Sequence, residues 1–230
     1  MRLLLFDVDG TLILSGGAGM RAFHRAFQHV FGVAVNREVI RPDGKTDPVI
    51  AREMLAHFGL EQCWSETSRN AMFSAYLEML EFEMSRAAAN GSLRALPGVV
   101  DLLQTLTRQP DFALGLATGN LERGTRIKLR HAGLDRYFSF GGFGSDADDR
   151  TKLIRLGISR GTCLCAPEAV DAAFVIGDTP LDIVHGHQAG ARVLAVASAR
   201  YSMTDMEPYR PEMLVPDLSA VDDILSFFRA

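Results

Sequence analysis

The chain has 230 residues, of which 47% are hydrophobic and 23% are charged, and its formal net charge is −4 at pH 7. These values are typical of a soluble globular protein with one large domain, or with a domain that carries an insertion. The negative charge argues against a general nucleic-acid binder, and no apolar segment approaches the roughly 20 residues that span a bilayer. The N-terminal apolar run is too short for a signal peptide. We therefore expect a cytoplasmic protein that binds neither nucleic acid nor membrane.

The cysteines agree with a reducing compartment. Cys63, Cys163 and Cys165 form no even set, and no second pair or nearby histidine completes a zinc motif around Cys163-Leu164-Cys165. We therefore expect free thiols.

A predicted buried strand followed by two aspartates opens the chain. Residues 1–6 are mainly apolar and meet Asp7-Val8-Asp9-Gly10-Thr11. Carboxylates at positions i and i+2 of an extended segment point to the same side and repel each other, which raises one pKa. Such a pair is tolerated when a cation lies between the two groups, or when one carboxyl stays protonated to act as an acid. The alternative is that the two aspartates only end a strand at an Asp-Gly turn.

The next segment, residues 15–92, is predicted to be entirely helical. A link of small residues at 15–19 precedes helices at 20–31, 48–57 and 65–88. About a hundred residues separate the first predicted strand from the second, far more than one crossover helix needs. We therefore expect an insertion over the sheet, whose two ends near residues 14 and 92 lie close together. The link at 15–19 is suited to a hinge.

Strands alternate with helices after residue 92. Strands are predicted at 112–117, near 138–140, and at 173–176, 191–197 and 213–215. Helices are predicted at 96–106, 121–132, 151–160 and 167–172, and a further helix is predicted to end before 190. This alternation predicts a parallel sheet. We expect an α/β fold in which residues 1–14 and 93–230 form a Rossmann-like parallel-sheet core, and in which residues 15–92 form an inserted α-helical cap domain.

Polar residues follow the predicted strands at the edge where parallel sheets bind ligands. They are Asp7, Asp9, Thr118, Gly119, Asn120, Asp178 and Asp182. Clustered carboxylates suit Mg²⁺, and a threonine hydroxyl with backbone amides at the start of a helix suits an anion. Arg150 or Lys152 can supply the cation that balances phosphoryl oxygens. The pattern indicates a phosphate centre.

These motifs resemble the four motifs of the haloacid dehalogenase superfamily, and their order and spacing match its phosphatase branch. They comprise Asp7-Val8-Asp9-Gly10-Thr11, Thr118, the basic residue near 150 and Gly177-Asp178-Thr179-Pro180-Leu181-Asp182. The helical insertion resembles a cap placed between motifs one and two. Asp43-Gly44-Lys45-Thr46-Asp47 also resembles a cap loop of phosphoglycolate phosphatase-like members.

The resemblance implies an aspartyl-phosphate mechanism. Asp7 would be the nucleophile, and Asp9 would act first as the acid and then as the base. Mg²⁺ would be bound by the Asp7 side chain, the Asp9 carbonyl and Asp178, with Asp182 nearby as an indirect partner.

The resemblance also implies how the phosphate is held. Thr118 and the neighbouring Gly119 and Asn120 would contact phosphoryl oxygens. Arg150 aligns better than Lys152 with the third motif, and Arg can grip two oxygens at once. Lys45 is either a substrate contact from the cap or a solvated turn residue.

The expected function is hydrolysis of a small phosphate monoester, for which the resemblance suggests 2-phosphoglycolate. A phosphomutase similar to β-phosphoglucomutase needs the same residues and remains an alternative. A phosphonate hydrolase would need Lys45 to form a Schiff base, which its polar surroundings disfavour. A dehalogenase does not need the acid at Asp9, and a non-catalytic binding protein should have lost a motif residue. The expected partner is a small phosphorylated metabolite, and the protein is expected to be a monomer or a homodimer.

Overall fold

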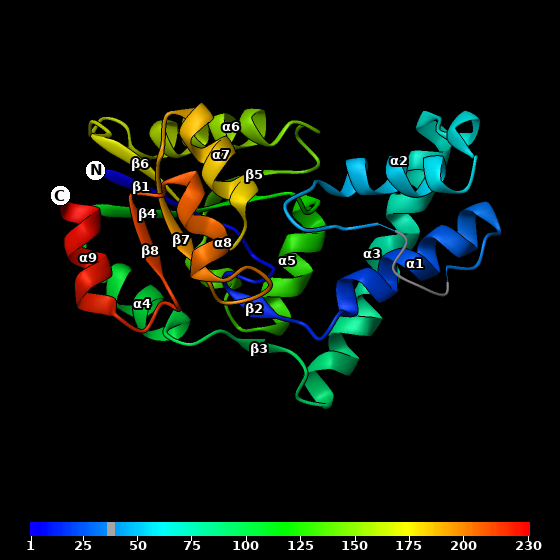
Figure 1. Cartoon of the computed structure of the whole chain (residues 1–230), viewed down its shortest axis with the longest axis horizontal. Helices are drawn as coiled ribbons and strands as arrows, with labels where there is room; N and C mark the ends of the chain where they lie inside the picture. Colours follow the sequence, from blue (N-terminus) through cyan, green and yellow to red (C-terminus); the bar gives the residue numbers. More distant parts are fainter. Residues whose placement is uncertain (36–39) are drawn as a thin grey trace.

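A parallel sheet is the centre of the fold (Figure 1). The computed structural model describes residues 1–35 and 40–230. In these ranges six strands form the main sheet in the order β5-β4-β1-β6-β7-β8. Their bounds are β1 Arg2–Phe6, β4 Phe112–Thr118, β5 Phe140–Phe143, β6 Ala172–Gly177, β7 Arg192–Val196 and β8 Met213–Val215. The α/β class predicted from the sequence is confirmed.

The central strand β1 is apolar on both faces, as a strand covered on two sides must be. Leu4 and Phe6 belong to one apolar cluster, and Leu3 and Leu5 belong to another. The first cluster includes helices α4 (Val99–Leu106) and α9 (Val221–Arg229), and the second includes α6 (Arg150–Cys165) and α7 (Pro180–Ala189). Figure 1 shows these pairs of helices on opposite faces of the sheet. β1 is therefore held rigidly between β4 and β6.

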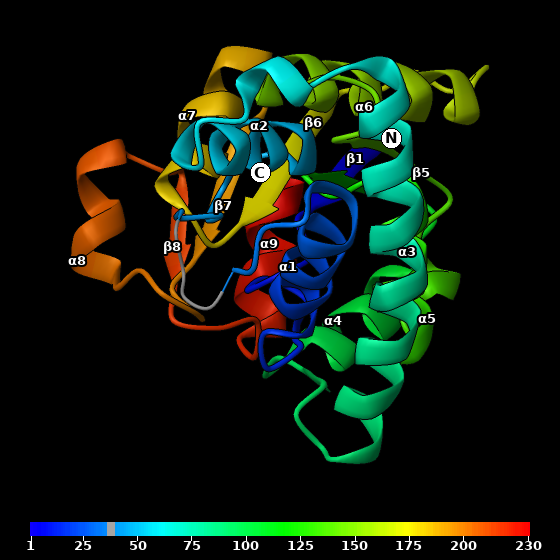
Figure 2. The same ribbon diagram turned by 90° about the vertical axis from the view of Figure 1, so that its right-hand side faces the viewer.

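Three helices lie beyond the carboxyl ends of the strands, and Figure 2 looks onto them. They are α1 (Ala18–Phe31), α2 (Asp47–His57) and α3 (Glu66–Ala89), with a short 3₁₀ helix, η1 (Glu61–Cys63), between the last two. They share an apolar cluster of their own, in which the rings of Phe23 and Tyr76 meet edge to face with 4.9 Å between centroids. The helices predicted at 20–31, 48–57 and 65–88 are therefore present.

The two connections to these helices pair with each other. β2 (Ile13–Leu14) and β3 (Arg94–Ala95) form a short antiparallel ribbon. The ends of the helical segment thus lie side by side, as the insertion hypothesis requires. The division into a core and a cap at 15–92 stays a prediction, and residues 36–39 of that range lie outside the described part.

Two predicted elements after residue 130 are wrong in position or type. The third strand was expected near 138–140, but β5 begins at Phe140 and runs through the glycines to Phe143, while η2 (Asp135–Tyr137) precedes it. The glycines are needed because α6 packs closely: a Cβ on Gly142 would lie 1.8 Å from the Leu153 carbonyl oxygen. The helix expected at 167–172 does not form. Instead α6 extends to Cys165, Pro167 disfavours further helix, and β6 begins at Ala172.

Three further helical elements connect strands of the main sheet. They are α5 (Glu122–His131), α8 (Met203–Met206) and η3 (Glu207–Tyr209). Across the described ranges, no helix combines the length and apolar character that a membrane crossing requires.

Candidate active site

A pocket of about 410 Å³ lies where the carboxyl edge of the sheet meets the helices α1 to α3. Asp7 follows β1, Thr118 ends β4 and Asp178 follows β6. Because these three neighbouring strands are parallel, their carboxyl ends meet at one edge. The pocket lining includes most of the residues that the sequence motifs predicted: Asp7, Asp9, Lys45, Thr118, Gly119, Asn120, Arg150 and Asp178.

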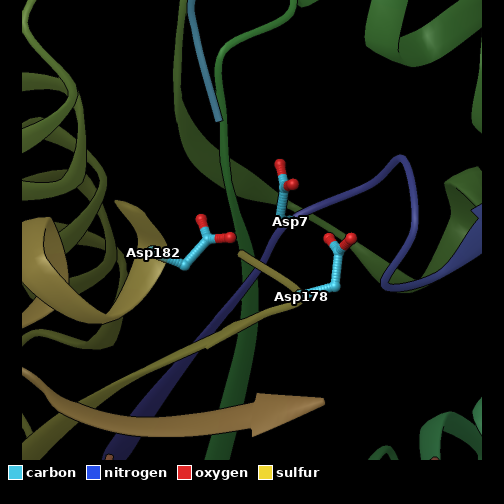
Figure 3. A group of neighbouring side chains, drawn as sticks. All are labelled: Asp7, Asp178 and Asp182. Atoms are coloured by element: carbon cyan, nitrogen blue, oxygen red, sulfur yellow. The ribbon is translucent and has the colours of Figure 1, made fainter. Parts of the chain in front are cut away.

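Three buried carboxylates lie close together at the carboxyl edge of the sheet (Figure 3). Asp7, Asp178 and Asp182 each offer an oxygen within 4.8 Å of the other two. Burial raises the pKa of Asp7 to about 6; Arg150 opposes this rise, and the carboxylates of Asp182 and Asp9 add to it. Burial also raises the pKa of Asp178 well above its ordinary value, and the neighbouring Asp7 and Asp182 add to the effect. The site therefore holds more negative charge than its surroundings balance.

This excess charge and the chemistry of the oxygens fit a hard divalent cation. Thr11 Oγ1 donates a hydrogen bond of 3.0 Å to Asp178 Oδ1 and so orients that carboxylate. Asp7 and Asp178 are the carboxylates that could hold Mg²⁺.

Asp182 has a different position. Its Oδ2 accepts from the Thr179 backbone amide at 3.0 Å, and Thr179 Oγ1 accepts from the Asp182 backbone amide at 3.3 Å, which makes a capping box at the start of α7. Asp182 Oδ2 also accepts from Thr179 Oγ1 at 2.7 Å. Its Oδ1 accepts from Arg150. Asp182 is thus both a helix-capping residue and the partner that holds Arg150, while its indirect contact with Mg²⁺ stays a prediction.

Arg150, rather than Lys152, points into the site. The buried Arg150 guanidinium is paired with Asp182 and lies 3.3 Å from Asp7 Oδ1. Burial works against its charge, but Asp182 and Asp7 together raise the pKa of Arg150, so it stays cationic. Lys152 is exposed, and its backbone amide donates a 2.9 Å hydrogen bond to Asp149 Oδ1, which caps the start of α6. Arg150 thus lies beside Asp7, and its role as the basic residue of the third motif stays a prediction.

Asp9 is held by two donors, one of which sequence reasoning missed. Asn120 Nδ2 donates to Asp9 Oδ2 at 2.8 Å and also to Thr118 Oγ1 at 2.8 Å. Lys128 Nζ, from α5, donates to the same Asp9 oxygen at 2.5 Å. The Asn120 side chain is therefore engaged with protein groups in this structure. Lys128 could have been suspected, because Gly124, Lys128 and Leu129 share the buried face of α5.

The loop at 43–47 closes one side of the pocket. Lys45 Nζ forms an ion pair with Glu53 at 2.5 Å, and Arg200 Nη1 forms one with Asp43 at 2.7 Å. Asp47, which the motif analysis quoted without a role, is buried and accepts a 2.8 Å hydrogen bond from the Leu121 amide. Lys45 therefore reaches the pocket but is already paired.

Comparison with known proteins agrees with the motifs. Residues 4–196 match the family model described as haloacid dehalogenase-like hydrolase. No curated protein matches the chain.

Solved structures share the fold over nearly the whole chain. A hydrolase from Pseudomonas syringae is 18% identical, with a TM-score of 0.72 and coverage of 99% of both chains. A protein described as a predicted phosphoglycolate phosphatase, from Haemophilus somnus, is 20% identical, with a TM-score of 0.68 and coverage of 97% of both chains. A β-phosphoglucomutase from Clostridium difficile is 14% identical, with a TM-score of 0.72 and coverage of 99% of this chain and 96% of its own. Since the family match spans most of the sequence, the chain belongs to the haloacid dehalogenase-like hydrolases.

Proposed function

We propose that the protein is a Mg²⁺-dependent phosphatase that hydrolyses a small phosphate monoester through an aspartyl-phosphate on Asp7. The observation that best supports this proposal is the contact of 3.3 Å between buried Asp7 and buried Arg150, in a pocket shared with Asp9 and Thr118. A nucleophile, a cation for phosphoryl oxygens and an acid thus lie in one site.

The proposed reaction has two steps. In the first, an Asp7 oxygen attacks phosphorus, the bond between phosphorus and the ester oxygen breaks, and Asp9 gives its proton to the departing alkoxide. In the second, water attacks the aspartyl-phosphate, its proton returns to Asp9, and phosphate leaves with Asp7 restored. The Arg150 guanidinium and the Thr118 hydroxyl stabilise the charge on the phosphoryl oxygens.

Mg²⁺ would be held by the carboxylates of Asp7 and Asp178 and the carbonyl of Asp9, where it would offset the negative charge of carboxylate and phosphate. Asp182 keeps Arg150 in place beside Asp7. These roles account for the buried charges of Asp7, Arg150, Asp178 and Asp182.

The size of the pocket and the basic residues at its wall support a small anionic substrate. Its volume is about 410 Å³, and Lys45 and Arg94 lie at its wall. Arg94 is exposed on β3 and, like Lys45, could meet a second polar or anionic group of the ester. We therefore propose 2-phosphoglycolate as the first ester to test, with hexose phosphates next because a β-phosphoglucomutase shares the fold.

The proposal is tested by phosphate release from 2-phosphoglycolate, hexose phosphates, nucleoside monophosphates and a phosphonate, with Mg²⁺ or with EDTA. Wild-type protein is expected to hydrolyse at least one ester only with Mg²⁺. Asp7→Asn is expected to lower the rate by about 1,000-fold or more, because the nucleophile is lost. Asp223→Asn, at an exposed position of α9, is the matched control and should retain wild-type activity.

Two results would count against the proposal. If no ester is hydrolysed faster than by Asp7→Asn, the protein is not a phosphatase of these compounds. If hexose phosphates are interconverted without phosphate release, the protein is a phosphomutase.

A further inference from the structure

Lys128 is a buried ammonium group beside a residue of the proposed reaction. It lies on α5, and only 3% of its surface is exposed. A buried ammonium is unfavourable unless it is paired. Its Nζ donates to Asp9 Oδ2 at 2.5 Å and to Asn120 Oδ1 at 2.7 Å. Lys128 therefore satisfies its charge mainly through Asp9.

The contacts around Asp9 treat its two carboxylate oxygens differently. Oδ2 accepts from Lys128 and, at 2.8 Å, from Asn120 Nδ2. Among the described residues, no side chain donates a hydrogen bond to Oδ1. The Asp9 side chain is 43% exposed and lines the pocket. One oxygen is thus fixed by the protein, and the other is left to solvent or substrate.

The position of the Lys128 ammonium is itself constrained from several sides. A Cβ on Gly19, in the first turn of α1, would lie only 3.3 Å from Nζ. Asn120 is in turn fixed by its 2.8 Å bond to Thr118 Oγ1. The carboxylate of buried Asp47 also interacts with the Lys128 ammonium. Burial raises the pKa of Asp47, and the positive charge of Lys128 opposes that rise. The lysine is therefore enclosed by α1, α2 and the segment after β4, and has little freedom to leave Asp9.

We propose that Lys128 is a positioning residue that, together with Asn120, clamps Oδ2 of Asp9 so that Oδ1 carries the proton to and from the reacting groups. This inference rests on the proposed role of Asp9 as acid and base. The inference goes further in one respect: a lysine on α5 sets the orientation of the Asp9 carboxylate before any substrate is bound. Lys128 itself does not touch the reacting atoms.

The dependence of rate on the leaving group tests this role. An alkyl phosphate needs a proton on its departing oxygen, whereas p-nitrophenolate leaves readily without one. Lys128→Met is expected to lower kcat/KM about 10- to 100-fold for the best alkyl phosphate of the panel, which is part of the range typical of general acid catalysis. For p-nitrophenyl phosphate the loss should stay within about threefold. Lys152→Met, the same substitution at an exposed site on α6, is the matched control.

An equal loss of kcat/KM for both esters would indicate a merely structural role and would overturn the inference. An unchanged kcat/KM for both esters would also overturn it. If Lys128→Met does not fold, Lys128→Gln gives the same comparison with a neutral polar side chain. Circular dichroism and thermal unfolding of each variant establish that the compared proteins are folded.

A crystal structure of Lys128→Met provides a readout that is independent of turnover. The inference predicts that the 2.8 Å contact between Asn120 Nδ2 and Asp9 Oδ2 is lost in the variant and present in the wild type. If Asp9 keeps its position in the variant, the inference is wrong even if the wild type hydrolyses esters. If Asp9 moves but the wild type hydrolyses no ester, the positioning contact is supported and the phosphatase proposal fails.

Discussion

Two polar contacts of Asp47 cross the boundary between α2 and the edge of the sheet. Its backbone amide donates to the Gly119 carbonyl at 2.8 Å, and its Oδ2 accepts from the Leu121 amide at 2.8 Å. Burial raises the pKa of Asp47 to about 6, although Lys128 and the Leu121 amide oppose the rise. The carboxyl group is therefore more easily protonated in the folded protein than in the unfolded chain.

This shift predicts a pH dependence of stability. Because the folded pKa, about 6, lies above the ordinary value of 3.8, the contribution of Asp47 is fully present below pH 3.8 and is lost as pH rises to 6. The loss amounts to about 3 kcal/mol. Asp47→Asn stays neutral, so its free energy of unfolding relative to wild type should rise by about that amount between pH 4 and 7. Urea unfolding across this range measures the difference.

Asp223→Asn is the control for removal of an exposed carboxylate. The free energy of unfolding of Asp47→Asn relative to wild type could instead stay constant or fall with rising pH. Either result would show that burial does not raise the pKa of Asp47.

The sequence predicted one kind of site residue well and another kind poorly. Asp7, Asp9, Thr118 and Asp178 follow strands in a fixed order, so their meeting at one edge follows from parallel pairing alone. Lys128 lies in the interior of a helix, and its importance depends on how α1 packs beside it. Such a contact is tertiary: the spacing of Lys128 with Gly124 and Leu129 places it on the buried face of α5 but does not identify Asp9 as its partner. Roles in catalysis remain predictions for all these residues.

At the level of elements, α6 packs unusually close to the sheet because it carries glycines on its inner face. A Cβ on Gly157 would lie 2.7 Å from Leu5 Cδ2 and 3.0 Å from the Gly142 amide nitrogen. The α6 backbone at Gly157 thus lies directly against the β5 backbone at Gly142. Any added side-chain atom would force this helix and strand apart and reduce the packing between them. Gly124, inside α5, is different, because a Cβ there would meet only side-chain atoms at 3.5 Å or more.

These two helical glycines give a matched pair of substitutions. Gly157→Ala is expected to destabilise the protein by about 1–3 kcal/mol through overpacking. Gly124→Ala is expected to be neutral or to stabilise it by up to about 1 kcal/mol, because alanine restricts the unfolded chain. Chemical denaturation of both variants measures the free energies. If Gly157→Ala proved as stable as Gly124→Ala, α6 would be free to move away from the sheet.

The same close packing explains why one strand was misplaced by the sequence analysis. Glycine is uncommon in strands, so Gly141-Gly142 favoured a loop. In the structure these glycines belong to β5, because the neighbouring helix leaves no room for side chains. The other strands of the main sheet are rich in branched and aromatic residues and were predicted within a residue or two of their bounds, whereas the short strands β2 and β3 were not predicted.

On the scale of the whole molecule, several polar contacts join the segment at 43–52 to the sheet layer. Arg52 forms an ion pair of 2.8 Å with Asp148, and Arg200 forms one of 2.7 Å with Asp43. Both pairs are largely exposed and contribute little individually. Together with the buried hydrogen bonds of Asp47, they hold the structure in a form in which this segment covers one side of the pocket.

The excess charge in the pocket predicts how the whole protein responds to metal. Mg²⁺ should raise the thermal midpoint of wild-type protein, by the equivalent of about 2.7 kcal/mol at about 100 times its dissociation constant. Asp178→Asn removes one of three crowded carboxylates, so in EDTA at pH 8 it should be more stable than wild type. It should also lose the response to Mg²⁺. Thermal unfolding with Mg²⁺ and with EDTA measures both effects.

Asp223→Asn, which leaves the cluster intact, should respond to Mg²⁺ as wild type does. An Asp178→Asn protein that is less stable than wild type in EDTA would contradict the charge argument.

The central place of β1 has a consequence for how the protein is made. Its two neighbours are β4, which ends at Thr118, and β6, which ends at Gly177. On the ribosome, β1 is therefore synthesised long before either partner, and it cannot pair along both of its edges until β6, which begins at Ala172, has been added. Pairings this distant along the chain close slowly. Asp7, which follows β1, therefore meets Asp178 only when the sheet closes at β6.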